Sequence, residues 1–263
     1  MRNSVLRIVQ PLSLVSLPVL LPQLLSVKRR MPRLPEAAGT GGEVGGRGPR
    51  LRLLVVGDSM AAGVGVAHHR AGIAGQLAEK VADEADGSVA WQVVARGGAT
   101  AESTARKVAR DPITFEVERD AEEGRNAAGA PDLVVVMVGI NDLLRYRGLR
   151  AWRHDLDVLV TALRGRWEQA PPIAFCGFPP VWRFPALPQP SRAVLGLRAL
   201  RMDQVLRESA VRNGVFHVPL PVDSMASEPR SFFAEDRFHP SARGYAEMAG
   251  SFVPLALAGI AAR

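Results

Sequence analysis

Apolar runs alternate with amphipathic segments along most of the chain. Five runs are almost continuously apolar, like strands buried on both faces of a parallel sheet, and they lie at residues 51–57, 89–95, 131–139, 172–178 and 214–220. Apolar residues recur at helical spacing at residues 71–85, 100–110, 152–167, 191–213 and 241–257. Because strands that alternate with helices form parallel βαβ units, we predict an α/β fold. The expected architecture is a three-layer α/β/α sandwich with a five-stranded parallel sheet.

Residues 1–34 have a different pattern. The apolar stretch SVLRIVQPLSLVSLPVLLPQLLSV is interrupted by prolines and is followed by KRR. A secretory signal peptide carries a small-residue cleavage site after its apolar core, whereas basic residues there favour retention at the cytoplasmic side. We expect a membrane-associating segment or signal-anchor, with an unstructured leader as the alternative. The protein is therefore expected to be membrane-associated or cytoplasmic rather than secreted after cleavage.

The next segment, residues 35–50, reads PEAAGTGGEVGGRGPR and predicts a Gly-rich linker. This leaves residues 51–263 as the folded domain. The basic charge also belongs to the N-terminal part, because residues 1–50 contain eight Lys and Arg against two acidic residues. The remaining 25 basic and 24 acidic residues nearly cancel, so no nucleic-acid partner is expected despite a pI of about 10.6.

Polar clusters follow the predicted strands. Gly57-Asp58-Ser59 follows the first strand, Arg96 to Thr100 follows the second, and Asn141-Asp142 follows the third. A further cluster, DRFHP, precedes the last helix and contains Asp236 and His239. Because ligands bind at the carboxyl ends of parallel strands, we expect these clusters to meet at one edge of the sheet.

Acyl transfer through a serine uses such a set of residues. Ser59 is a weak nucleophile by itself and needs a base, which His239 can supply while Asp236 orients its imidazole. The backbone N–H groups of Ser59 and Gly98 and the side-chain amide of Asn141 are candidate donors to an oxyanion. A lone serine after a strand is more often a helix N-cap, so the interpretation depends on the whole set.

The four blocks VVGDSMAAG, RGGAT, VGINDLL and DRFHP, in this order over about residues 51–258, resemble the SGNH/GDSL hydrolase superfamily. The resemblance implies a flavodoxin-like sandwich with neither a metal nor an organic cofactor. It implies Ser59 as nucleophile, His239 and Asp236 as base and orienting carboxylate, and Gly98 and Asn141 as oxyanion donors. Members of the superfamily hydrolyse carboxylic esters and thioesters, including lysophospholipids and acetylated sugars.

The second block departs from the family pattern. Ala95 or Arg96 stands where the family usually carries an asparagine, which leaves Gly97 as an alternative oxyanion donor. We favour Gly98 because Gly98 to Thr100 fits the usual Gly-x-Thr ending. Arg96 is expected either to meet an anionic group of the substrate or to be a solvated surface residue. In the first block Met60 replaces leucine and should retain its packing role.

Other polar residues are expected to be structural or exposed. Asp58 and Asp142 are interpreted as structural, Cys176 as a buried strand thiol and His217 as a strand residue, while the remaining candidates face solvent: His68, His69 and His154. The segment FPPVWRFPALPQP, residues 178–190, follows the fourth strand. It is expected to be an apolar lid over an acyl chain or a packed surface loop.

The sequence thus predicts a serine hydrolase of carboxylic or thio esters, esterase-like or lysophospholipase-like, acting on a small-molecule or lipid ester. The alternatives are a carbohydrate O-deacetylase or acyltransferase on the same fold, and a non-catalytic binding protein.

Overall fold

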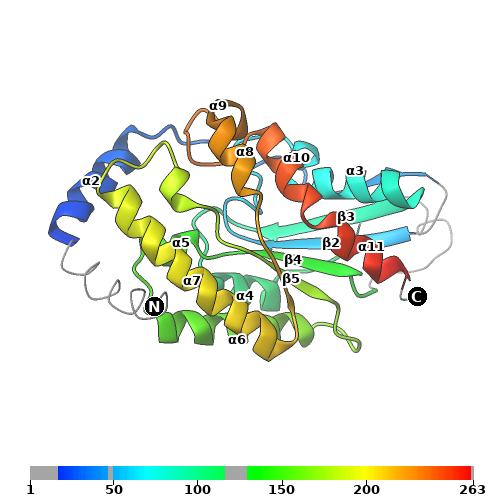
Figure 1. Ribbon diagram of the computed structural model, residues 1–263. Coiled ribbons are helices and arrows are strands. Elements are labelled where there is room, and N and C mark those ends of the chain that lie inside the picture. The colour runs from blue at the N-terminus through cyan, green and yellow to red at the C-terminus, as the bar shows by residue number, and fades with distance from the viewer. Residues whose placement is uncertain (1–16, 47–49, 116–128, 262–263) are drawn as a thin grey trace.

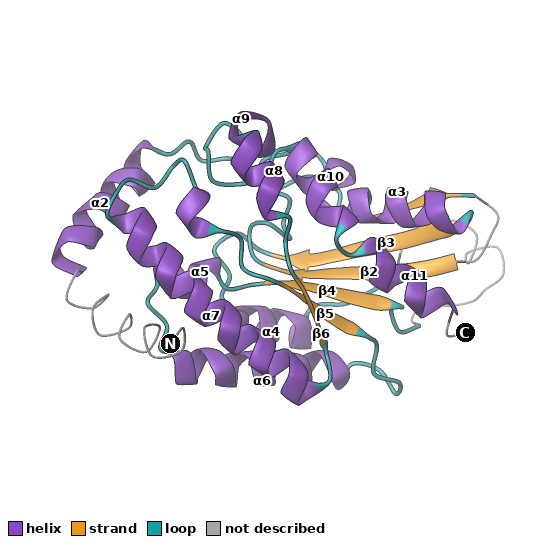
Figure 2. Cartoon of the chain, viewed as in Figure 1, coloured by secondary structure: helices purple, strands orange, loops and turns teal. Residues whose placement is uncertain are grey.

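The computed structural model describes residues 17–46, 50–115 and 129–261 and contains a mixed sheet of six strands (Figures 1 and 2). The strand order is β1-β3-β2-β4-β5-β6. The strands are β1 (Gly41–Gly45), β2 (Arg50–Gly57), β3 (Ser88–Ala95), β4 (Leu133–Met137), β5 (Ile173–Cys176) and β6 (Phe216–Val218). Strands β2 to β6 are mutually parallel and correspond to the five predicted runs, which confirms that part of the prediction.

Helices cover both faces of the sheet (Figure 1). On one face lie α3 (Ile73–Ala85), α10 (Ala242–Gly250) and α11 (Val253–Ala261). The other face carries α4 (Ala101–Arg110), α6 (Leu149–Arg164) and α7 (Ser191–Asn213). Shorter elements connect them: η1 (His69–Ala71), α5 (Ile140–Leu144), η2 (Val181–Arg183), α8 (Val222–Ser227) and α9 (Pro229–Phe232).

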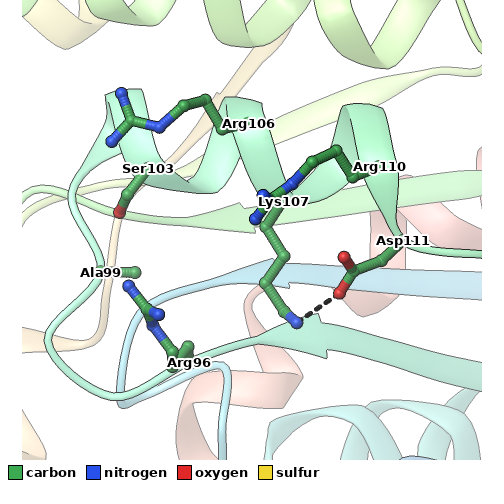
Figure 3. A pocket seen from close by; sticks show the side chains of 7 residues that line it. All are labelled: Arg96, Ala99, Ser103, Arg106, Lys107, Arg110 and Asp111. Atoms are coloured by element: carbon green, nitrogen blue, oxygen red, sulfur yellow. Dashed lines mark hydrogen bonds and ion pairs between the residues drawn. The ribbon is translucent and has the colours of Figure 1, made fainter.

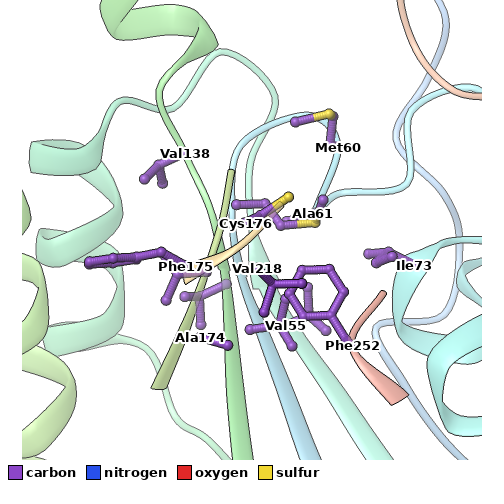
Figure 4. Packing of buried hydrophobic residues seen from close by; sticks show 14 of the residues in the cluster. Val55, Met60, Ala61, Ile73, Val138, Ala174, Phe175, Cys176, Val218 and Phe252 are labelled. Atoms are coloured by element: carbon purple, nitrogen blue, oxygen red, sulfur yellow. The ribbon is translucent and has the colours of Figure 1, made fainter. Parts of the chain in front are cut away.

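The core lies between these layers. All five residues of β4 are buried, as its continuous apolar run predicts. Figure 4 shows Val55 and Val218 on the side of the sheet that faces Ile73 and Phe252, whereas Phe175 points to the opposite side. This core fixes the carboxyl ends of the parallel strands, and therefore the turns that follow them.

Strand β1 is the main difference from the sequence prediction. It pairs antiparallel with β3, so residues 41–45 belong to the sheet although they fall in the segment predicted as a linker. Gly42 lies opposite Trp91, and a Cβ atom at Gly42 would be only 2.8 Å from the indole ring. The glycines that suggested a linker therefore let the backbone pass directly over a large side chain.

Part of the N-terminal segment is also ordered against the domain. Helix α2 (Leu17–Arg30) buries Leu20 completely and lies near the start of α7. The Gln23 amide donates to the Gln189 carbonyl oxygen at 3.0 Å and accepts from the Ser191 hydroxyl at 2.6 Å. Among the residues that the structure describes, no helix has both the length and the apolar character needed to cross a bilayer. The apolar residues 1–16 lie outside the described residues.

Candidate active site

The turn after β2 directs Ser59 to the carboxyl edge of the sheet. Gly57 has φ +149°, and a Cβ atom there would lie 1.9 Å from the Met137 carbonyl oxygen, so only glycine fits without a shift of β4. The Asp58 N–H donates to the same Met137 oxygen at 2.9 Å. The Asp58 carboxylate then accepts from the Met60 N–H at 3.0 Å and closes the turn around Ser59.

Ser59, His239 and Asp236 form a continuous hydrogen-bonded chain. The distance from His239 Nε2 to Ser59 Oγ is 2.8 Å, and that from His239 Nδ1 to Asp236 Oδ2 is 2.6 Å. The structure therefore brings together three predicted residues from opposite ends of the domain. This arrangement allows the imidazole to accept a proton from the hydroxyl while the carboxylate fixes the ring.

The turn that carries His239 also fixes Asp236. Its other oxygen, Oδ1, accepts from the backbone N–H groups of Phe238 and His239, each at 2.9 Å. Burial alone would raise the pKa of Asp236, but the hydrogen bonds from His239 and Phe238 outweigh it and lower the pKa below its ordinary value. Asp236 is therefore ionised at neutral pH and can stabilise an imidazolium.

The loop after β3 contains the candidate oxyanion donors. Gly98 has φ +76°, and the space where its Cβ atom would lie is open. The Gly97 N–H donates to Glu36 Oε1 at 2.6 Å, whereas no described residue accepts from the Gly98 N–H. The geometry therefore leaves Gly98, not Gly97, free to donate to a ligand. Asn141 stands beside this loop, because its Nδ2 donates to the Ala99 carbonyl oxygen at 3.0 Å.

Two residues that support this loop were missed by the sequence analysis. Arg145 donates from Nη2 to the Gly98 carbonyl oxygen at 3.1 Å, and Glu36 accepts a hydrogen bond from the Gly97 N–H. Arg145 lies one helical turn after Asn141, so its spacing could have indicated it. Glu36 lies in the Gly-rich segment, where no sequence pattern marks it.

Asp58 and Asp142 lie beneath the site and bind backbone groups, as the structural interpretation of them expects. Asp142 Oδ2 accepts from the Ala101 N–H at 3.2 Å. Burial raises the pKa of Asp58 to about 7 and the pKa of Asp142 to about 6. A nearby carboxylate adds to each shift, Asp142 for Asp58 and Asp155 for Asp142. One oxygen of each lacks a hydrogen-bond partner among the described residues. These carboxyl groups are therefore largely protonated at mildly acidic pH.

The remaining histidines and the cysteine lie as expected with one exception. His68 and His154 are exposed and Cys176 is buried, where desolvation raises the pKa of its thiol. His217 on β6 contacts Asp203 of α7 at 3.0 Å. The prediction for His69 is wrong, since this side chain is 2% exposed and lies beside Trp91. The chain segment before β1 covers it, and the His69 N–H donates to the Ala38 carbonyl oxygen at 2.9 Å.

Residues 178–190 form a packed segment rather than a loose lid. Val181, Phe184 and Leu187 are buried. The Phe184 ring meets Phe238 edge-on with centroids 5.0 Å apart, and Phe238 in turn contacts His239. Of the two alternatives, the packed loop is the one observed, and it stiffens the turn that carries His239.

Comparison with known proteins agrees with this geometry. The family model described as the GDSL-like lipase/acylhydrolase family matches residues 55–247, well over half of the chain. The chain belongs to this family. Its members are ester hydrolases, and the resemblance found in the sequence is thereby confirmed.

The individual proteins that this chain resembles share less than a third of its residues. It is 28% identical to a GDSL-like esterase of Mycobacterium tuberculosis over 212 residues, which cover 79% of this chain and 62% of that protein. A lipase/acylhydrolase from Enterococcus faecalis has a TM-score of 0.53 and 21% identity, with 78% of this chain and 94% of that chain covered. A lipase from a goat rumen metagenome has a TM-score of 0.56 and 16% identity, covering 78% and 97%. The two structures confirm the fold.

Among the described residues, no group of three or more His, Cys, Asp or Glu side chains is placed to bind a metal ion.

Proposed function

We propose that this GDSL-family protein is a serine hydrolase that cleaves carboxylic or thio esters through an acyl-serine intermediate. The observation that carries the proposal is the hydrogen-bonded chain from Ser59 Oγ through His239 to Asp236, at 2.8 Å and 2.6 Å. Each imidazole nitrogen of His239 has one of the other two residues as its partner, which three polar residues that are neighbours by chance would rarely show. Members of serine hydrolase classes on unrelated folds use the same geometry.

The reaction follows from these contacts. His239 Nε2 takes the Ser59 proton as Oγ bonds to the acyl carbon, and the carbonyl oxygen becomes an oxyanion. The N–H groups of Ser59 and Gly98 and the Asn141 amide stabilise that oxyanion. The imidazolium then gives its proton to the leaving alcohol or thiol as the acyl–heteroatom bond breaks. Water then gives a proton to His239 as its oxygen attacks the acyl carbon, and His239 passes that proton to Ser59 Oγ as the acyl–Oγ bond breaks and the acid leaves.

We further propose that the substrate is a small or lipid ester and that the protein associates with a membrane surface. Helix α2 supports this, since Leu21 and Leu25 are 51% and 52% exposed and Lys28 to Arg30 form its last turn. Apolar side chains beside basic residues suit an anionic bilayer surface. Co-sedimentation with anionic vesicles should fall when Leu21 and Leu25 are replaced by serine, and unchanged co-sedimentation would contradict the proposal.

Labelling with a fluorophosphonate tests the nucleophile. We expect one adduct on Ser59, located by mass spectrometry, and none in Ser59→Ala. Ser227→Ala, which removes an exposed serine of α8, is the matched control and should be labelled like the wild type. If folded wild-type protein forms no adduct and hydrolyses no ester, the non-catalytic binding protein becomes the better interpretation.

A profile of acyl-chain length then identifies the class of ester. An esterase or lysophospholipase should accept chains longer than two carbons. A carbohydrate O-deacetylase should accept acetyl esters alone, and an acyltransferase should give more ester product than acid when an acceptor alcohol is added.

A further inference from the structure

A small basic pocket lies between α4 and the loop that contains Gly98 (Figure 3). Its volume is about 120 Å³. The α4 residues that line it recur at helical spacing on one face of the helix. The lining consists of Arg96, Ala99, Ser103, Arg106, Lys107, Arg110 and Asp111.

The positive charge of this pocket is only partly neutralised. Arg106 pairs with Glu102, and Lys107 pairs with Asp111. Among the residues that the structure describes, no carboxylate pairs with Arg96 or Arg110. Because like charges that face one cavity repel each other, their arrangement favours a bound anion.

Helix capping does not account for Arg110. A basic residue at a helix C-terminus often bonds the last carbonyl groups. Here Arg166 has that role, since it donates to the carbonyl oxygens of Ala109 and Asp111 at 3.3 Å and 3.1 Å. The Arg110 guanidinium therefore remains available to a ligand in the pocket.

We propose that this pocket binds a phosphoryl group or a similar tetrahedral oxyanion. Guanidinium groups match the geometry of phosphate oxygens and can bind them through paired hydrogen bonds. At roughly 30 Å³ per water molecule, the pocket corresponds to a few waters or one five-atom anion. It is smaller than the roughly 300 Å³ of the smallest typical ligand clefts, so an acyl chain or a sugar ring does not fit.

The pocket shares its walls with the candidate oxyanion loop. Arg96 and Ala99 flank Gly97 and Gly98 in the chain and both line the pocket. The Arg96 N–H donates to the Gly57 carbonyl oxygen at 3.2 Å, and the Ala99 carbonyl oxygen accepts from Asn141. An anion there contacts the loop that should stabilise the transition state. This part of the inference rests on the proposed function, and it predicts ester substrates that carry a phosphoryl group.

Binding of inorganic phosphate tests the pocket without requiring catalysis. We expect calorimetric titration of the full chain, at constant ionic strength, to show one saturable site that Ser59→Ala retains. Arg96→Gln and Arg110→Gln should each weaken binding by about tenfold or more, the usual effect of losing a charge-assisted hydrogen bond. Lys80→Gln is the matched control, because α3 lies on the opposite face of the sheet.

Equal phosphate affinity in the wild type and both arginine variants would overturn the proposal, as would the absence of saturable binding. Circular dichroism spectra and melting curves show whether each variant is folded. Arg110→Gln changes an exposed helical position and provides the test if Arg96→Gln does not fold. Because Ser59→Ala is included, a failure of phosphate binding is distinguishable from a failure of the hydrolase proposal.

A pair of substrates distinguishes the source of the anion. An acyl ester of glycerol 3-phosphate is compared with the same acyl ester of glycerol. If the substrate supplies the phosphoryl group, the phosphorylated ester has the lower KM in the wild type, and Arg96→Gln raises only that KM. If free phosphate is the ligand, both esters have the same KM, and phosphate still binds in an Arg96-dependent way. Both outcomes support the pocket and assign its ligand.

Discussion

The two halves of the candidate active site are built differently. The proposed nucleophile and base lie in two tight turns that are fixed by their own residues. Asp58 accepts from the Met60 N–H, and Asp236 accepts from the N–H groups of Phe238 and His239. The candidate oxyanion loop, residues 96–99, is instead exposed over most of its length, and side chains from elsewhere in the chain form hydrogen bonds to it. The residues of the proposed proton path, Ser59, His239 and Asp236, thus lie in turns that are stabilised by hydrogen bonds among their own residues. The loop proposed to meet the substrate depends instead on side chains from remote parts of the chain.

Removing the nucleophile or base should have the largest effect. Ser59→Ala or His239→Ala is expected to lower kcat by about 10⁶-fold, because the two residues act as one unit. The double variant should be no worse than either single variant. The measurement is hydrolysis of a short p-nitrophenyl ester, with His154→Ala, an exposed helical histidine, as control. Additive losses in the double variant would contradict the shared role.

The turn around Ser59 should make stability depend on pH. The pKa of Asp58 is raised from 3.8 to about 7 in the folded state, so folding favours its protonated form. That contribution is fully present below pH 3.8 and is lost as the pH rises through about 7, with an upper limit of roughly 4 kcal/mol.

The variant Asp58→Asn should therefore reduce the fall in the free energy of unfolding between pH 4 and pH 7. Urea denaturation at several pH values measures this fall, and Asp83→Asn on the exposed side of α3 is the control. A wild-type stability that does not change over this range would contradict the raised pKa.

In the oxyanion half, Asn141→Ala should lower kcat by about 10²- to 10³-fold, as does the loss of one oxyanion donor in other hydrolases. KM should change little, because the donor acts mainly in the transition state. Asn141→Asp, which retains the shape but loses the amide protons, should be equally impaired. Full activity in Asn141→Ala would remove this residue from the proposed mechanism.

The smallest effect is expected at Glu36, whose carboxylate accepts from a backbone N–H of the loop. Glu36→Gln retains an acceptor for the Gly97 N–H and should leave kcat within about twofold, whereas Glu36→Ala removes one charge-assisted hydrogen bond and should lower kcat by about tenfold. Glu43→Ala, on β1 but away from the loop, is the control. Equal activity of the Ala and Gln variants would show that Gly97 needs no acceptor.

The sequence predicts some parts of the molecule much better than others. Strands β2 to β6 and the residues after them were predictable, because continuous apolar runs mark buried strands and Ser59, Asn141, Asp236 and His239 lie in short motifs. Glu36 and β1 were not, since their roles arise from pairing across the sheet and the glycines there resemble a linker. The exposed position predicted for His69 is wrong for the same reason, because a linker would lie apart from the domain, whereas the segment before β1 covers His69.

Strand β1 also limits how the molecule can be divided. The family match begins at residue 55, beyond β1. That boundary falls inside β2, and even a fragment cut between β1 and β2 would leave β3, eight residues long, as an edge strand and uncover the Trp91 ring. Long apolar edges recruit strands from other molecules, whereas a short glycine-rich edge such as β1 offers few side chains for such pairing. Loss of the five residues of β1, which a family boundary drawn from motifs alone would discard, is therefore expected to lengthen the sheet edge that is open to pairing.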